Sequence, residues 1–304
     1  MNPLDLQVNG YTGVDFNSDD LTSESLHAAC QALDQDGVSA ILATFITDSL
    51  AAMTQRVQRL VTLRAADPLA QRIVRGIHLE GPFLSPQPGF CGAHPTAHML
   101  PASPEAIQPL LDAGAGLVRL VTLAPEQDAA GRTTRFLADQ GITVSTGHAN
   151  PSLQQLEAAI DSGLSMVTHL GNACPLDLPR HDNIIQRCLT LSDRLWICMI
   201  PDGVHIPFFA LKNYLRVVPP ERAIFVTDAI SAARLGPGQH RLAGREIDIG
   251  EDLVARLPNG MLCGSTVTVP RIIELSQQHL GLFDADLTRL LDTNPRLAVP
   301  LPAP

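Results

Sequence analysis

The stretch ITVSTGHANPSLQQLEAAIDSGLSMVTHL, residues 142–170, contains one complete strand–helix–strand unit. It begins with the apolar run ITVSTGH, which ends in His148, and closes with the run LSMVTHL, in which His169 is the penultimate residue. Between them, PSLQQLEAAIDSG has apolar residues at helical spacing and ends in glycine, as helices commonly do. The two histidines are 21 residues apart (148 to 169), about one such unit, which predicts that they lie on neighbouring strands.

The same alternation continues on both sides of this stretch. The apolar runs LDLQVN, SAILATF, RIVRGIHLE and GLVRLVTLAP precede it, LWICMI and RAIFVTDA follow it, and helix-like segments lie between most of them. Eight strands alternating with helices favour an α/β fold of the TIM-type (β/α)₈ barrel, here a single catalytic barrel domain over residues 1–304. The alternative is a doubly wound open sheet, which is disfavoured because no glycine-rich dinucleotide loop follows the first strand.

Two segments interrupt the alternation. Residues 85–105, after the third strand, form a long loop rich in proline and glycine, and loops of this length are commonly functional or disordered. Residues 235–263 are expected to form short hairpins.

The composition of the chain limits which kinds of partner it is expected to bind and in which cellular compartment it is expected to work. The net charge is −10, with 31 acidic and 21 basic residues and no basic stripe, so nucleic acid is not an expected partner. No apolar run approaches the ~20 residues that cross a membrane, and the N-terminus does not read as a signal peptide. The six cysteines include no C-x-x-C pair, which predicts reduced thiols and a cytoplasmic enzyme.

Polar side chains end four of the apolar runs. Glu80 ends RIVRGIHLE, Asp228 ends the apolar part of RAIFVTDA, and His148 and His169 end the two runs described first. In one parallel sheet these ends meet, and one carboxylate with two imidazoles suits one divalent metal, Zn²⁺ or Fe²⁺ rather than Mg²⁺. The alternatives are an ion pair for Glu80 and a helix N-cap for Asp228. His78, two residues before Glu80, is interpreted as a core histidine or one that supports a ligand.

Further polar residues complete a hypothetical site for metal-assisted hydrolysis. Asp228 suits transfer of a proton from a water molecule to a leaving amine. His94, in CGAHP, and His205, in PDGVHIP, are candidate donors to a substrate oxygen. Gln7 and Asn9 point to the same face of the first strand, which indicates polar groups lining one side of the cavity or a hydrogen-bonded strand end.

Eight short motifs occur together in one order. Through them, from the first strand to about residue 298, the chain resembles the N-acetylglucosamine-6-phosphate deacetylase family of the amidohydrolase superfamily. The motifs are D-L-Q-V-N-G (5–10), H-L-E-G-P-F (78–83), G-A-H-P (92–95), S-T-G-H (145–148), T-H-L-x-N-A-x-P (168–175), D-G-V-H (202–205), V-T-D-A (226–229) and C-G-S (263–265).

This resemblance implies the roles of the central residues. Glu80, His148 and His169 correspond to the ligands of a single metal ion, and Asp228 corresponds to the catalytic acid and base. His94 matches a histidine that contacts the acyl carbonyl or the developing oxyanion. The superfamily's usual H-x-H on the first strand is Q-x-N here (residues 7–9), which implies a branch that binds one metal instead of two.

The resemblance also implies how substrate is bound. Asn172 and Ala173 match a cradle for the sugar phosphate, and His205 matches a residue that contacts the sugar or the phosphate. Arg180, eight residues after Asn172, matches an arginine that reaches the phosphate of the neighbouring subunit's substrate, so a homodimer is expected. The alternative for Arg180 is a surface salt bridge. The other substrate-binding positions implied are Gln7, Asn9, Ala93 and Cys263.

The chain departs from the family pattern in two places. Family members begin with a small β-sandwich that their C-terminal segment completes, whereas this chain starts at the first barrel strand, so a barrel without that sandwich is expected. The loop before Gly92 reads Gly89-Phe90-Cys91, where relatives commonly carry basic residues. The sequence therefore supports recognition of the acyl group better than recognition of the 6-phosphate.

The expected reaction is metal-dependent hydrolysis of the N-acetyl group of an amino sugar phosphate. N-acetylglucosamine 6-phosphate would give glucosamine 6-phosphate and acetate. The alternatives are another N-acylated substrate, such as N-acetylgalactosamine 6-phosphate or an N-acyl amino acid, and a non-catalytic sugar-phosphate-binding barrel.

Overall fold

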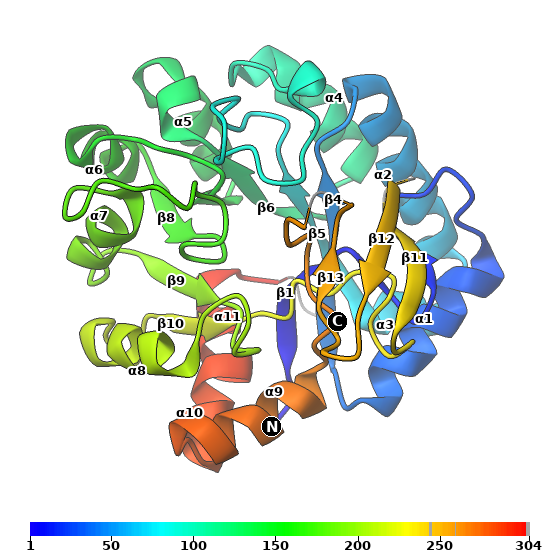
Figure 1. The fold of residues 1–304 in the computed structure, drawn as a ribbon. Coiled ribbons are helices and arrows are strands. Elements are labelled where there is room, and N and C mark those ends of the chain that lie inside the picture. The colour runs from blue at the N-terminus through cyan, green and yellow to red at the C-terminus, as the bar shows by residue number, and fades with distance from the viewer. Residues whose placement is uncertain (243–244, 259, 302–304) are drawn as a thin grey trace.

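The computed structural model describes residues 1–242, 245–258 and 260–301 (Figure 1). Eight parallel strands lie side by side in chain order, as a barrel requires and a doubly wound sheet does not, so the predicted (β/α)₈ barrel is confirmed. The strands are β1 (Leu4–Val8), β4 (Ala40–Ile46), β5 (Val74–Glu80), β6 (Val118–Leu123), β7 (Thr143–Thr146), β8 (Leu164–Val167), β9 (Trp196–Met199) and β10 (Ala223–Phe225).

Helices surround the sheet and bury their apolar faces against it (Figure 1). Helix α6 shows how the sequence sets them: Ser152 caps its start in a capping box with Gln155, and Leu156 and Ala159 face the core. The α-helices are α1 (Ser23–Gln35), α2 (Leu50–Ala65), α3 (Pro68–Ile73), α4 (Pro104–Gly114), α5 (Arg132–Asp139), α6 (Leu153–Asp161), α7 (Ile184–Thr190), α8 (Phe208–Val217), α9 (Val269–Leu275), α10 (Asp284–Thr288) and α11 (Asn294–Ala298). Shorter helical turns are η1 (Thr96–His98), η2 (Pro125–Gln127), η3 (Ala129–Gly131), η4 (Ser276–Leu280) and η5 (Arg289–Thr293).

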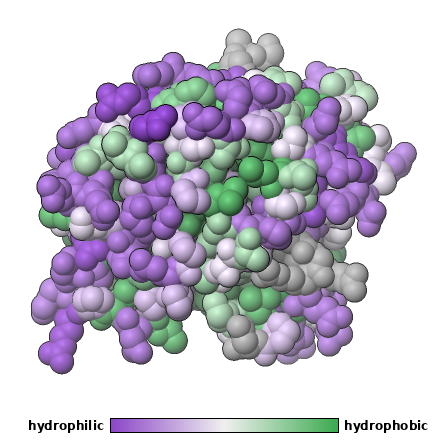
Figure 2. Space-filling model, turned by 90° about the horizontal axis from the view of Figure 1, so that it is seen from above, coloured by the Kyte–Doolittle hydropathy of each residue, from purple (hydrophilic) through white to green (hydrophobic). Residues whose placement is uncertain are grey.

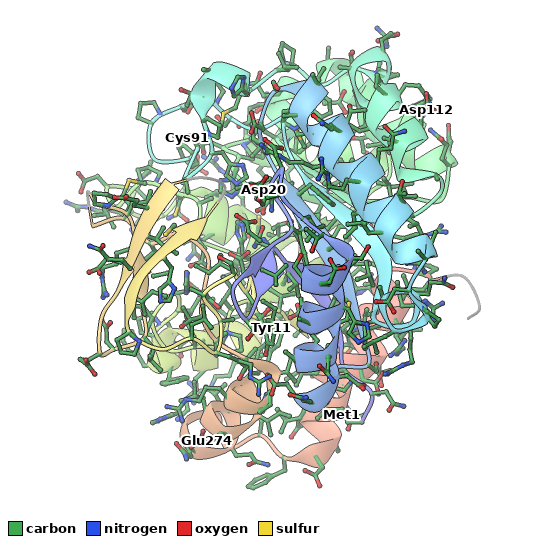
Figure 3. All side chains as sticks on the ribbon, turned by 90° about the vertical axis from the view of Figure 1, so that its right-hand side faces the viewer. Met1, Tyr11, Asp20, Cys91, Asp112 and Glu274 are labelled. Atoms are coloured by element: carbon green, nitrogen blue, oxygen red, sulfur yellow. The ribbon has the colours of Figure 1, made fainter. Side chains whose placement is uncertain are left out.

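A small antiparallel sheet covers part of the barrel end at which the strands finish. It consists of β11 (Gly238–Leu242), β12 (Arg245–Ile249) and β13 (Ala255–Arg256), so hairpins were predicted correctly for this segment. Ile247 and Ile249 pack with Ile230, from the loop after β10, in a second apolar cluster. A further short pair is formed by β2 (Gly10–Tyr11) and β3 (Val14–Asp15). Viewed from the side, Cys91 lies toward the same end as the small sheet, and Met1 lies toward the other (Figure 3).

One face of the molecule is mainly polar. Figure 2 shows a face on which hydrophilic side chains predominate and hydrophobic ones are scattered among them. Among the described residues, none of the helices combines the length and the apolar character that crossing a bilayer requires.

The barrel closes along a seam between its first and last strands. Val8 forms a parallel bridge with Ala229, and the backbone N–H of Asn9 donates to the Ala229 carbonyl at 2.7 Å. Deeper in the seam, the buried Asp5 carboxylate accepts a hydrogen bond from the Thr227 hydroxyl at 2.5 Å. The backbone hydrogen bonds between the first and last strands are few, and side-chain hydrogen bonds supplement them.

Asp5 is expected to make stability depend on pH. Burial raises the pKa of its carboxyl from 3.8 to about 6, despite the hydrogen bonds from Thr227 and Gln7. The folded protein thus keeps this proton to a higher pH than the unfolded chain, so this group's stabilisation is complete below about pH 4 and is lost as pH rises to about 6. The loss corresponds to about 3 kcal/mol of unfolding free energy.

Asp5→Asn should abolish this contribution, because an amide does not titrate and can still accept from the Gln7 and Thr227 backbone. Urea unfolding of both proteins between pH 4 and pH 8 measures the difference. The exposed Asp139 at the end of α5 provides a matched control, since Asp139→Asn should follow the wild type. Parallel pH profiles for Asp5→Asn and the wild type would contradict the expectation.

Candidate active site

Three of the predicted residues converge at the carboxyl ends of β5, β7 and β8. The Oε1 atom of Glu80 lies 2.8 Å from Nε2 of His169 and 3.2 Å from Nε2 of His148. All three side chains are buried, and one ligand atom from each lies within 4.8 Å of the others. The barrel thus brings together residues that are far apart in the sequence.

The residues present fit a divalent cation. Nδ1 of His148 donates to the carbonyl of Phe90 at 3.0 Å, so Nε2 is the nitrogen that would bind a cation. Nε2 of His148 faces the same Glu80 oxygen as Nε2 of His169. One carboxylate and two imidazole nitrogens directed at a common point form a donor set that suits Zn²⁺ or Fe²⁺.

Charge coupling within the set is strong. Burial alone would raise the pKa of Glu80, but its hydrogen bonds with His148 and His169 hold the pKa well below the usual value. Burial alone would lower the pKa of His169, but its hydrogen bond with Glu80 and the charge of that carboxylate raise it. Without a cation these groups form a buried ion pair, so their arrangement is held by mutual attraction.

The fourth residue, Asp228, lies just after β10 and is buried beside this set. Its Oδ1 accepts a hydrogen bond from Nδ2 of Asn9 at 2.8 Å. Burial, followed by the negative charge of Glu80, raises the pKa of Asp228 to about 7. A neighbouring cation would lower that pKa again, which favours the carboxylate needed to accept a proton.

Three of the site residues have left-handed backbone conformations. The φ angles are +52° at His148, +28° at His169 and +49° at Asp228. Residues other than glycine seldom adopt such angles, which cost about 1–3 kcal/mol each when the surroundings impose them. His148 and His169 lie two residues after the ends of β7 and β8, and Asp228 lies three residues after the end of β10. This strain is therefore concentrated where the polar groups converge.

A cavity of about 90 Å³ opens onto these groups. Gly92 permits its wall to approach closely, because a Cβ atom at this position would lie 2.8 Å from the His148 ring. The predicted site residues that line the cavity are Asn9, Glu80, Ala93, His94, His148, His169, Asn172, His205, Asp228 and Cys263.

Three predicted substrate-binding residues lie elsewhere. Gln7 lies behind the carboxylate of Glu80, with its Nε2 atom 3.1 Å from Oε2. Ala173 lines a small neighbouring cavity of about 20 Å³ that also contacts His148 and His169. Arg180 is exposed on the loop between β8 and α7, and no hydrogen bond or ion pair of its side chain is found among the described residues.

His94 and His205 are each oriented by a partner that the sequence did not single out. The backbone N–H of Thr47 donates to Nδ1 of His94 at 3.3 Å, so the ring proton of His94 is on Nε2. Nδ1 of His205 lies 2.6 Å from Oδ2 of Asp202. Asp202 belongs to the D-G-V-H motif and could have been found there, whereas nothing in the sequence marks Thr47.

His78 has the structural role that its position indicated. It is fully buried, its Nε2 lies 2.7 Å from the Thr122 hydroxyl, and its Nδ1 lies 3.3 Å from the Thr44 hydroxyl. Burial lowers its pKa to about 4, so it is neutral near pH 7. It serves as a core histidine on the strand that carries Glu80.

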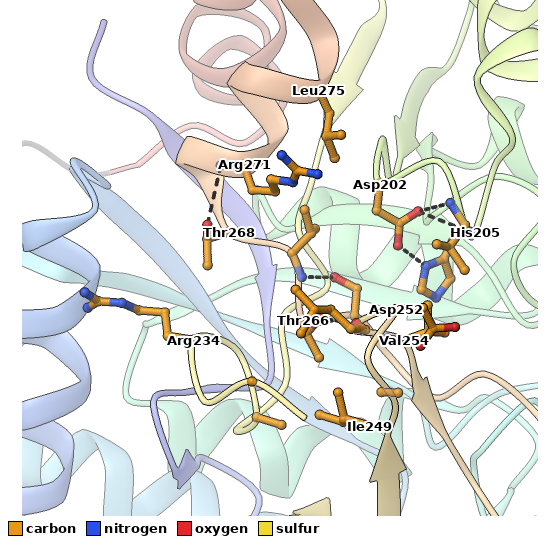
Figure 4. Close-up of a pocket in the computed structure, with 17 residues that line it drawn as sticks. Asp202, His205, Arg234, Ile249, Asp252, Val254, Thr266, Thr268, Arg271 and Leu275 are labelled. Carbon is orange, nitrogen blue, oxygen red and sulfur yellow. Dashed lines mark hydrogen bonds and ion pairs between the residues drawn. The ribbon is translucent and has the colours of Figure 1, made fainter. Parts of the chain in front are cut away.

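A larger cavity of about 500 Å³ lies beside the first (Figure 4). Asp202 and His205 form part of its wall, together with Arg234 and Arg271, and His205 also borders the smaller cavity. It is not lined by Glu80, by the two histidines beside it, or by Asp228. The candidate metal ligands and Asp228 therefore line the smaller cavity and not the larger one.

No protein-family model matches the chain. It is 37% identical over 258 residues to N-acetylglucosamine-6-phosphate deacetylase from Bos taurus and likewise to that from Homo sapiens, matching 81% of this chain and 61% of theirs. The chain thus spans about six tenths of the length of these curated relatives. It is 29% identical over 296 residues to N-acetylgalactosamine-6-phosphate deacetylase from Escherichia coli O157:H7, covering 96% of this chain and 75% of the relative.

Solved structures resemble the whole barrel. N-acetyl-D-glucosamine-6-phosphate deacetylase from Mycobacterium smegmatis, in complex with N-acetyl-D-glucosamine-6-phosphate, matches with a TM-score of 0.88 and 32% identity. That match covers 99% of this chain and 78% of the other. The corresponding Thermotoga maritima enzyme matches with a TM-score of 0.86 and 25% identity, covering 98% and 77%.

Proposed function

The chain belongs to the N-acetylglucosamine-6-phosphate deacetylase family, and we propose that it hydrolyses the N-acetyl group of an amino sugar phosphate. The observation that carries this proposal is the buried set of Glu80, His148 and His169 with Asp228 beside it. N-acetylglucosamine 6-phosphate is the first candidate substrate, because the similar Mycobacterium smegmatis enzyme binds it. The whole of residues 1–304 would act as one catalytic barrel domain.

The residues of the set would hold one divalent cation, Zn²⁺ or Fe²⁺. When bound, such a cation polarises a carbonyl group and lowers the pKa of a water molecule. Gln7 and Asn9 leave the first strand without imidazole ligands, which supports one cation instead of two.

Asp228 would act as both base and acid. As the oxygen of a water molecule bonds to the acetyl carbonyl carbon, the Asp228 carboxylate takes a proton from that water. It then gives the proton to the sugar nitrogen while the carbon–nitrogen bond breaks, so that acetate and the free amine leave. Its position in the same cavity as Glu80 and His169 supports this role.

His94 would stabilise the negative charge that develops on the acetyl oxygen. Because the Thr47 N–H faces Nδ1, the ring proton of His94 is on Nε2, which is the nitrogen that would donate to the acetyl oxygen. A preorganised donor of this kind contributes about 2.7–4 kcal/mol to a transition state. Its ring centroid lies 4.3 Å from that of His148, which keeps the donor close to the proposed ligands.

The remaining assignments concern the sugar and its phosphate. Asn172 and His205, the latter held by Asp202, line the cavity and would contact the sugar phosphate, and Ala173 would complete the cradle from the small neighbouring cavity. Ala93 and Cys263 would contact substrate through the lining of the cavity.

The six cysteines form no disulfide, which supports a cytoplasmic location.

An acetate-release assay on the purified, metal-loaded chain tests the proposed function. The panel is N-acetylglucosamine 6-phosphate, N-acetylgalactosamine 6-phosphate, N-acetylglucosamine and an N-acetyl amino acid. The second sugar is included because the Escherichia coli O157:H7 relative bears its name. Turnover of a phosphorylated sugar is expected, and acetate release from none of them would favour a non-catalytic binding barrel.

Arg180→Ala should separate recognition of the phosphate from catalysis. If Arg180 binds the phosphate in the partner subunit of a homodimer, its loss should raise KM for the phosphorylated sugar about 10–100-fold, with kcat nearly unchanged. The exposed Arg72, which pairs with Asp34 on another part of the surface, gives the control Arg72→Ala. Initial rates with and without the 6-phosphate measure the effect, and equal KM values in Arg180→Ala and the wild type would make Arg180 an ordinary surface residue.

A further inference from the structure

Two amide side chains on β1 and directly after it each contact a different carboxylate of the site. Gln7 and Asn9 are two residues apart on the same face, and both are buried. Nε2 of Gln7 donates to Oε2 of Glu80 at 3.1 Å, and Nδ2 of Asn9 donates to Oδ1 of Asp228 at 2.8 Å. Gln7 therefore contacts the candidate metal ligand, and Asn9 contacts the proposed acid.

The contact with Gln7 orients the carboxylate of Glu80. Oε1 faces the Nε2 atoms of His148 and His169, and Oε2 is the atom that Gln7 holds. A carboxylate is free to rotate about its last bond unless both oxygens are engaged. By engaging Oε2, Gln7 directs Oε1 toward the point where the two imidazoles converge.

The contact with Asn9 fixes Asp228 in a corresponding way. The backbone N–H of Asn9 donates to the Ala229 carbonyl, and its own carbonyl accepts from Phe16, so the amide projects from a fixed point on the barrel seam. Its nitrogen must face Asp228, because the reversed amide would place an oxygen against the carboxylate. With Oδ1 of Asp228 held in this way, Oδ2 remains to exchange the proton.

The unused end of Asn9 lies at the cavity. Oδ1 of Asn9 is buried, and no hydrogen-bond partner for it is found among the described residues. Buried polar atoms without a partner are uncommon in proteins, and this one belongs to a residue that lines the catalytic cavity. An N–H or O–H group of substrate or water can satisfy it, which supports placing Asn9 next to the reacting groups and Gln7 behind them.

We propose that Gln7 and Asn9 are positioning residues with separate tasks, Gln7 for the cation and Asn9 for proton transfer. The assignment of Asn9 rests on the proposed function, whereas that of Gln7 rests only on the donor set. Removing Gln7's donor should weaken cation binding. Removing Asn9's donor should slow turnover in a protein that still binds its cation normally.

Gln7→Met and Asn9→Leu test the division of tasks, because each keeps much of the side-chain volume and removes the donor. Competition between the protein and a zinc chelator gives the Kd for zinc, and acetate release at saturating zinc gives kcat and KM. Gln7→Met should raise the Kd for zinc about 10–100-fold and recover most of its kcat when zinc is saturating. Asn9→Leu should keep that Kd within about threefold and lower kcat about 10–100-fold with little change in KM.

A matched control is Asn294→Leu. Asn294 is also a buried amide, but it donates to the carbonyls of Pro220 and Ala223 at the opposite end of the barrel. Its loss should reduce stability without changing the Kd for zinc or kcat. Gln7→Ala and Asn9→Ala, which leave room for water, take the place of either variant that does not fold.

Two results would overturn the proposal: an unchanged Kd for zinc in the Gln7 variant, or an equal shift of that Kd in the Asn9 variant. Both are decided by chelator competition alone. A wild-type protein that binds zinc but releases no acetate would instead count against the proposed function. The role of Gln7 would then still be decided by the Kd for zinc of the Gln7 variant.

Discussion

Asp228→Asn is expected to lower kcat for acetate release by about 10⁴-fold while the protein keeps its cation. This is the upper end of what general acid–base catalysis contributes, and in the proposed reaction the same carboxylate acts in both halves. An amide has nearly the same shape and can still accept from Asn9, but it cannot take a proton from water or return one to the amine. The measurement is acetate release at saturating substrate, together with metal content per chain.

The matched control for this prediction is the exposed Asp139→Asn, which should behave as the wild type. Metal content near the wild-type value in Asp228→Asn would show that the loss of turnover comes from proton transfer and not from an empty site. Turnover within about tenfold of the wild type would instead remove Asp228 from the role of acid and base. The proton would then have to pass through another group of the cavity.

Removal of the cation is expected to have the second large effect. A chelated protein should lose acetate release to the background rate and regain it when Zn²⁺ or Fe²⁺ is added back. It should also unfold at a lower temperature, because a ligand at 1,000 times its Kd stabilises the folded state by about 4.1 kcal/mol. The extent of recovery with each metal compares the two candidate cations.

Glu80→Gln sharpens this experiment. The substitution keeps the shape of the side chain and removes the negative charge on which both histidines converge, so the site should bind cations much more weakly. Chelation should then change neither the activity nor the thermal unfolding of the variant, because there is little cation to remove. Full activity in a chelated wild-type protein shown to be free of metal would contradict a metal-dependent mechanism.

The fold was predictable from sequence because each strand is a short apolar run between recognisable helices. The unit that contains His148 and His169 is an example: its helix has a capping box, its core face is regularly spaced, and its strands are neighbours in the sheet. The convergence of Glu80 with these histidines followed from the rule that the carboxyl ends of parallel strands meet. Neither inference required knowledge of a side-chain conformation.

The sequence did not reveal how deep in the closed barrel each side chain lies or which neighbour it contacts. The period of two placed Gln7 and Asn9 on one face, but Gln7 is two residues deeper in the barrel and contacts the back of Glu80, while Asn9 lines the cavity. The contact between Thr47 and His94 joins two loops whose approach is set only by the folded barrel. Propensity and periodicity carry no information about such contacts.

The left-handed turns at His148, His169 and Asp228 have a consequence for directed evolution. Glycine adopts these φ angles without strain but has no side chain with which to bind a cation or carry a proton. In a library selected only for resistance to heat, changes to glycine or asparagine should therefore accumulate at these positions ahead of the rest of the barrel. Screening this protein for thermostability should therefore include an assay of the proposed activity at every round, because the substitutions that most readily raise heat resistance would remove the side chains of the site.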